Sequence, residues 1–145
     1  MATITRSAGG VTVALVDDVR LEVSLRDMSG VARNLETVGR ALWVARTRAV
    51  LDSAGVAAEP VPLGWRAEAY VAGRAAIVAR GRSRDGLVEL EVVGMRRWRA
   101  GVARAGRADT ARAIQEAGEA LLADQWAQIR VLKRTIWQPG RVQTE

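Results

Sequence analysis

Apolar and polar residues alternate in two short segments near the start of the chain, residues 11–15 and 19–25. In each segment every second side chain is Val or Leu, and this period of two is typical of a strand with one buried face. The acidic pair Asp17-Asp18 between them is polar and tolerates turn geometry. The pattern therefore predicts a β-hairpin.

The pattern then changes to the period of a helix. Apolar residues recur at intervals of three and four from about Gly30 to Ser53, which predicts one amphipathic helix with a buried apolar stripe. Ser29 precedes this segment at the N-cap position, and Gly55 follows it as a C-terminal stop.

Residues 57–64 interrupt the helical pattern. Pro60 and Pro62 lack a backbone N–H and restrict the residues before them, so a helix cannot continue here. We expect an extended loop that reaches across to a neighbouring subunit. Pro60, Pro62, Leu63 and the following Trp65 are therefore candidates for a protein interface.

Strand signals return in the second half of the chain. Residues 66–72 and 74–80 alternate weakly, with Gly73 as a bend or bulge between them. Residues 87–93 alternate clearly, and an Asp-Gly turn signal stands just before them. We expect a hairpin that joins 74–80 to 87–93 through a long tip at 81–84.

The stretch from Met95 to Gly106 fits either a further strand or a basic loop. Helical spacing returns over about 110–137, where Asp109 stands at the N-cap position. Gly118 in the interior of this segment costs about 1 kcal/mol relative to Ala and indicates a close helix contact.

These elements predict one α+β domain over residues 1–138. Its architecture is an antiparallel β-sheet with a long central helix and a C-terminal helix packed against it. Residues 139–145 are expected to form a flexible tail.

The composition fits one globular domain with an unusual core. The chain has 145 residues, 49% hydrophobic and 26% charged, but it has no Phe, and five Trp supply most of the bulk. We expect a thin core that neighbouring subunits help to complete. The first ten residues lack the apolar core of a signal peptide, and no stretch has the roughly 18 uninterrupted apolar residues of a membrane span. The sequence thus predicts a cytoplasmic protein without membrane contact.

The residue types needed for most catalysis are missing. The absence of Cys and His excludes thiol catalysis and zinc sites, and removes the commonest general base. Glu89 and Glu91 share a strand face, but we interpret them as partners of Arg74 or Arg80 rather than as an acid/base pair. No glycine-rich phosphate loop has the required spacing. We therefore expect no enzymatic activity, cofactor, metal or small-molecule substrate.

The charge is strongly basic. The net charge is +6, with 22 basic residues. This excess reflects either a GC-rich codon bias or a surface that meets a polyanion. The candidates for contact with nucleic acid or for the lining of a lumen are Arg82, Arg84, Arg96, Arg97, Trp98 and Arg99, with Trp98 able to stack on a base. A solvated loop with Trp98 turned inward is the alternative.

Two further tryptophans lie at the edges of helical stripes. Trp43 lies just beside the stripe of the first helix, and Trp137 ends the last helix. Aromatic residues at the border of a buried face are favoured in protein interfaces, so both join the interface candidates.

One run of residues resembles a known family. The run Val19 to Gly39 is similar to the opening of tailed-phage tail-completion and neck proteins, and Ala49 to Gly55 resembles the Ala-rich end of the helix in that family. The family's Pro-x-x-Thr-Gly turn is echoed by Pro60-Val-Pro-Leu-Gly64, with Leu in place of Thr. In layout the resemblance covers roughly 19–137.

The resemblance implies a non-enzymatic structural virion protein that is assembled in the host cytoplasm. It would form a homo-oligomeric ring at the head–tail junction, between the capsid connector and the tail tube. The alternative hypothesis is a basic nucleic-acid-binding protein, with DNA contacted through the arginines. Salt dependence separates the two, because counterion release weakens nucleic-acid binding while an apolar interface survives salt.

Overall fold

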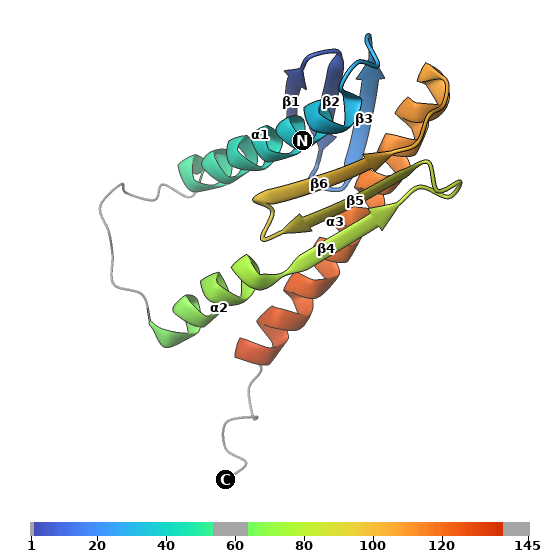
Figure 1. The fold of residues 1–145 in the computed structure, drawn as a ribbon. Helices are drawn as coiled ribbons and strands as arrows, with labels where there is room; N and C mark the ends of the chain where they lie inside the picture. The colour runs from blue at the N-terminus through green and yellow to red at the C-terminus, as the bar shows by residue number, and fades with distance from the viewer. Residues whose placement is uncertain (1, 54–63, 138–145) are drawn as a thin grey trace.

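The computed structural model describes residues 2–53 and 64–137 (Figure 1). Over these residues it contains two three-stranded antiparallel sheets and three helices, in the order βββααβββα. This confirms the predicted α+β class with a long C-terminal helix, although the strands divide into two sheets. The predicted helix stop at Gly55, most of the 57–64 loop and the tail from 139 lie outside the described residues.

The first sheet has the order β1-β2-β3, with β1 (Thr3–Ala8), β2 (Val11–Val16) and β3 (Arg20–Leu25). The predicted hairpin is β2–β3, and its turn is made by Asp17 and Asp18, whose φ angles are 52° and 66°. These positive values suit the tight turns that join antiparallel strands. Strand β1 was not predicted, because it is mostly polar and exposed.

Helix α1 (Val31–Ser53) confirms the predicted first helix. The predicted cap at Ser29 is wrong by one residue, since the Asn34 amide donates to the Gly30 carbonyl, 2.9 Å away. Gly30 has a φ of 61°, which a glycine adopts without steric cost.

Helix α2 (Trp65–Ala76) replaces the strand that was expected over 66–72 and the first residues of the strand expected over 74–80, and for these residues the expectation is wrong. The weak alternation in this segment comes from alanines. Five of its twelve residues are Ala, the strongest helix former, and Val71 is the one β-branched residue. The helix propensity of alanine therefore outweighs an alternation that involves few large apolar side chains.

The second sheet has the order β4-β5-β6, with β4 (Val78–Arg82), β5 (Val88–Val93) and β6 (Arg97–Val102). The predicted hairpin is confirmed as β4–β5, but Gly81 and Arg82 belong to the strand rather than to its tip. Of the two possibilities for 95–106, the further strand is correct.

Helix α3 (Arg107–Trp137) begins earlier than predicted. Asp109 lies inside its first turn, and the Gly106 carbonyl accepts the first helical amide. Gly118 does mark a close approach, but to the Leu21 side chain of β3 rather than to a helix. At Gly81 the backbone of β4 lies directly against α3.

The two long helices join the sheets into one core. Helix α1 contacts β1 and β2 of the first sheet and β6 of the second, and α3 contacts β4 and β5 of the second sheet and β3 of the first. Each half of the chain thus contains a βββα unit, with α2 between the two units, and the long helix of each unit also packs against the sheet of the other (Figure 1).

Helix carboxylates accept backbone amides of three edge strands. The Glu119 carboxylate accepts the Leu21 amide of β3 at 3.0 Å, while Asp124 accepts an amide of β4 at 2.9 Å and Glu36 one of β6 at 2.8 Å. Unpaired strand edges template association with other chains. Within the described residues, β1 is the sheet edge that receives no such helix side chain.

Candidate assembly surfaces

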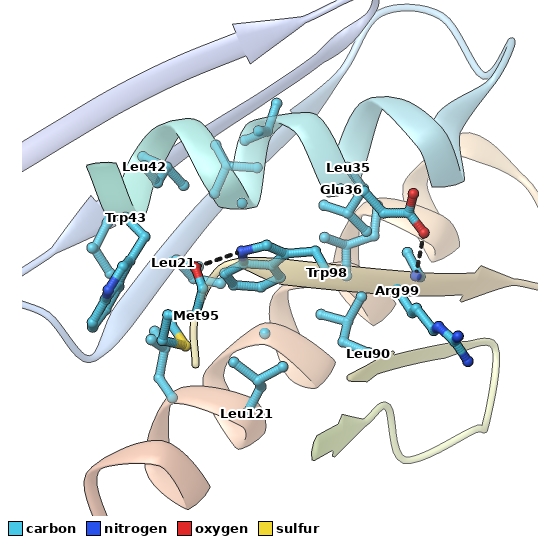
Figure 2. Close-up of a pocket in the computed structure, with 18 residues that line it drawn as sticks. Leu21, Leu35, Glu36, Leu42, Trp43, Leu90, Met95, Trp98, Arg99 and Leu121 are labelled. Carbon is cyan, nitrogen blue, oxygen red and sulfur yellow. Dashed lines mark hydrogen bonds between the residues drawn. The ribbon is translucent and has the colours of Figure 1, made fainter. Parts of the chain in front are cut away.

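A small apolar cavity lies between α1, α3 and the two sheets (Figure 2). Its volume is about 50 Å³, and its ionisable lining residues are Glu36 and Arg99. The ring of Trp98 closes it against the backbone of Gly39. Because a cavity that admits benzene measures about 150 Å³, this one is a packing gap in the core and too small for a cofactor.

Trp98 faces this cavity and not the solvent, as Figure 2 shows. Its indole Nε1 donates to the Met95 carbonyl at 3.1 Å, and the residue is half-buried. From the sequence, Trp98 was a candidate for stacking on a base, with an inward orientation as the alternative. The inward orientation is correct.

The arginines of the second sheet lie on its outer face, opposite the core. Arg80 and Glu91 form an ion pair of 2.9 Å, and Arg82 lies 3.7 Å from Glu89. Arg99 is the cross-strand partner of Glu91 on its other side. The predicted pairing with Arg80 is therefore confirmed for Glu91, whereas Glu89 lies beside Arg82. The other predicted partner, Arg74, lies over the ring of Tyr70 in α2. Of the remaining candidates, Arg96 and Arg97 are exposed near the β5–β6 turn.

The tip of the β4–β5 hairpin, which carries the candidate Arg84, is tied to α3. The amide of Arg84 donates to Glu116 at 3.1 Å, and Arg112 forms a 3.0 Å ion pair with Asp85. Asp85 also accepts the Leu87 amide at 3.1 Å and the Ser83 hydroxyl at 2.8 Å. These hydrogen bonds lower the pKa of Asp85 from 3.8 to about 2, and the bond from the Leu87 amide has the largest effect.

This tip should weaken in acid. The unfolded chain binds a proton at Asp85 near its ordinary pKa of 3.8 and the folded chain only near 2, so the stabilisation is complete above about pH 4 and is lost as the pH falls toward 2. We expect the stability difference between the wild type and Asp85→Asn to shrink over this range, as measured by urea unfolding at pH 5 and pH 2. A carboxyl titration of folded Asp85 by NMR with a midpoint near 3.8 would contradict the assignment.

Trp43 was an interface candidate, and the structure corrects this. It is 8% exposed and packs against Trp126 of α3, with ring centroids 5.9 Å apart. The guanidinium of Arg46 lies 4.9 Å from both rings and pairs with Asp18 at 3.2 Å, while the Trp126 indole donates to the Asp18 carbonyl at 2.8 Å. The cluster fastens α1, α3 and the β2–β3 turn together inside one subunit.

A comparison of the chain with protein families, curated proteins and solved structures finds no match in any of the three. Among the described residues, no group of three acidic side chains is placed to hold a metal ion, and no helix is long and apolar enough to cross a membrane.

Trp65 and Trp137, the other two tryptophan candidates, lie on a pair of helices that we call the arm: α2 and the C-terminal part of α3 from Ile129. Figure 1 shows both extending away from the two sheets. The rings of Tyr70 and Trp137 lie 5.5 Å apart, and Gly73 lets the side chain of Leu132 approach the α2 backbone. Trp65 is 62% exposed and Trp137 45% exposed.

The arm is poorly buried by the rest of the subunit. No residue of α2 is buried by the described part of the chain, and the arm also exposes Val71 and Val131 at 57% and 56%. Isolated exposed apolar residues are normal, but large exposed apolar groups gathered on one element mark interaction sites. Sequence reasoning identified Trp65 and Trp137 but missed Val71, because residues 66–72 were expected to form a strand, and it also missed Val131 of α3. The other interface candidates, Pro60, Pro62 and Leu63, lie outside the described residues.

Proposed function

We propose that this protein is a non-enzymatic assembly protein whose subunits associate through the arm. The observation that carries the proposal is the helix pair itself. Two helices packed side by side bury one stripe each and leave their remaining apolar side chains in water. Contact with the arm of a neighbouring subunit would remove Trp65, Val71, Val131 and Trp137 from water, at about 25 cal/mol per Å² of apolar surface buried.

The resemblance to tail-completion and neck proteins extends this proposal to a particular assembly. In that setting the subunits form a ring at the head–tail junction of a phage particle, between the capsid connector and the tail tube. The absence of His and Cys agrees with a structural role, and the basic charge agrees with a ring around a DNA passage. The phage assignment rests on the resemblance alone.

The nucleic-acid alternative is less well supported by the geometry. Its stacking residue, Trp98, is turned into the core, and Arg80 and Arg82 have carboxylate partners on the same sheet face. The remaining candidates Arg84, Arg96, Arg97 and Arg99 are exposed, as arginines are in many basic proteins. A strong fall in DNA affinity with rising salt, and its loss in an Arg96→Ala/Arg97→Ala variant, would restore this alternative.

Replacing one exposed valine of the arm should dissociate the assembly. Val131→Glu places a carboxylate in an interface that excludes water, which costs several kcal/mol when the charge is unpaired. We expect the wild type to be a discrete oligomer that persists in high salt and the variant to dissociate with a roughly 100-fold higher dissociation constant. Light scattering behind a sizing column at low and high salt measures both.

Val19→Glu is the matched control. Val19 is 58% exposed, almost the same as Val131, but lies at the β2–β3 turn away from the arm. This variant should keep the mass of the wild type. A wild-type monomer at all concentrations, or equal masses for the wild type and Val131→Glu, would show that the arm does not drive self-association.

A further inference from the structure

Strand β1 is an edge strand of the first sheet, and the side of it that faces away from β2 could pair with a further strand. The Asp17 amide donates to the Ala2 carbonyl at 3.0 Å, which fixes the hydrogen-bonding phase of the β1–β2 ladder. In an antiparallel pair the bonding direction alternates from residue to residue. The backbone groups of Thr3, Thr5 and Ser7 therefore point away from β2.

The molecule protects its other sheet edges but not this one. Within residues 2–53 and 64–137, carboxylates of α1 and α3 accept amides at the edges of β3, β4 and β6. At β1 the outer carbonyl of Thr5 accepts a bond from the guanidinium of the adjacent Arg6, at 2.7 Å. That bond is exposed, and an incoming strand could replace it.

A groove lined by arginine lies beside the β1 edge. Its walls are Arg6 of β1 and one side of α1 from Thr37 to Asp52, including Arg40, Val44 and Arg48. Figure 1 shows the second half of α1 continuing past β1, beyond the edge of the first sheet. A fourth strand next to β1 would thus lie beneath α1, with alternate side chains directed at this groove.

The charge of the groove selects the occupant. Three arginines and one aspartate line it, together with small apolar residues of α1. A second copy of β1 carries its own Arg6 and its own arginine-lined groove, so pairing between copies would bring like charges together. Duplex DNA offers negative charge but no alternating N–H and C=O groups to match a strand edge.

We propose that the β1 edge and the α1 groove bind an extended acidic segment of a partner protein, added as a fourth strand to the first sheet. Backbone hydrogen bonds to Thr3, Thr5 and Ser7 supply the pairing, and carboxylates on every second residue meet Arg6, Arg40 and Arg48. This site is separate from the arm, so it does not depend on the proposed self-association.

The test uses a fluorescein-labelled peptide of eight residues in which glutamate and threonine alternate, with binding followed by fluorescence anisotropy on the full chain. We expect Arg48→Glu to weaken binding at least about tenfold through like-charge repulsion. Arg33→Glu, on the same helix but outside the groove, should bind like the wild type. A peptide with glutamine in place of glutamate should also lose at least about tenfold.

Two changes test the backbone pairing separately from charge. Thr5→Pro removes one outward N–H without touching the bonds to β2, and we expect it to weaken binding at least about tenfold. Peptides N-methylated on all glutamates or on all threonines should differ in affinity. A strand that pairs along one edge donates the N–H groups of every second residue, so it tolerates methylation only on the other set. Arg48→Glu still tests the site if the proline variant fails to fold.

Several results would overturn the proposal. Equal binding of the two N-methylated peptides would mean that charge alone holds the peptide. A lower mass of Thr5→Pro in solution would assign the edge to a second copy of the chain. If duplex DNA displaces the peptide equally well from the wild type and from the Thr5→Pro variant, the groove is a nucleic-acid-binding surface. Loss of peptide binding in the Val131→Glu variant would mean that the peptide site depends on the arm.

Discussion

Gly81→Ala should be among the most destabilising single substitutions in this protein. A Cβ at this position would collide with the carbonyl oxygen of Ala117 and come within 2.5 Å of the Leu121 amide nitrogen in α3. Both are backbone atoms of a helix that is itself packed on the other sheet, so neither moves without shifting α3. We expect a loss of about 3 kcal/mol or more in the free energy of unfolding, at the upper end for overpacked sites. Urea unfolding followed by far-UV circular dichroism measures it.

Gly101→Ala is the matched control for this prediction. Gly101 is also a strand residue, but a Cβ there meets its nearest atom at an ordinary distance of 3.9 Å. Its effect on the free energy of unfolding should stay within about 1 kcal/mol. A small stabilisation can result, because alanine lowers the conformational entropy of the unfolded chain. If the two variants have equal stability, β4 and α3 are not in the close contact described above.

Trp43→Ala should cost about 3–5 kcal/mol, the range for emptying a buried aromatic site. Trp43 is 8% exposed, and its ring contacts both the Trp126 ring and the Arg46 guanidinium. Its removal leaves a cavity between α1 and α3 and takes away one of the two rings that hold Arg46 in place. The unfolding free energy is best followed by circular dichroism, since the substitution removes a fluorophore.

Trp65→Ala tests whether the loss of stability in Trp43→Ala comes from the burial of the side chain or only from the removal of a tryptophan. Trp65 is 62% exposed, so within one subunit its loss should change the unfolding free energy by about 0.5 kcal/mol or less. Low protein concentration keeps the contribution of association small in this measurement. A large cost at Trp65 together with a small one at Trp43 would reverse the assignment of the two side chains to arm and core.

Strong periodicity predicted the correct elements, and weak periodicity did not. The α1 stripe and the alternation of β5 are carried by Leu and Val, whose burial dominates the local choice. In α2 the alternation was carried by Ala, whose high helix propensity outweighs the little apolar surface that it can bury. Strand β1 has only Ile4 and Ala8 as apolar side chains in a mostly polar segment. Its pairing with β2, rather than its own hydrophobicity, holds it in the sheet.

The candidate surfaces were only partly visible in the sequence. The position of a tryptophan beside a helical stripe did not distinguish Trp43, which α3 covers, from Trp137, which stays exposed. That difference depends on packing between α1 and α3, elements that are about 80 residues apart in the sequence. The β1 edge could not be anticipated, because an edge exists only once strand order is known.

The placement of Glu119 and Asp124 on the last helix has a consequence for synthesis of the chain. Both sheets are complete by residue 102, whereas the side chains that cover the edges of β3 and β4 belong to α3. A nascent chain that has not yet reached this helix presents bare strand edges, which are templates for aggregation during translation. Slow decoding of the codons for α3, or premature termination within them, would therefore divert the product toward chaperones and inclusion bodies.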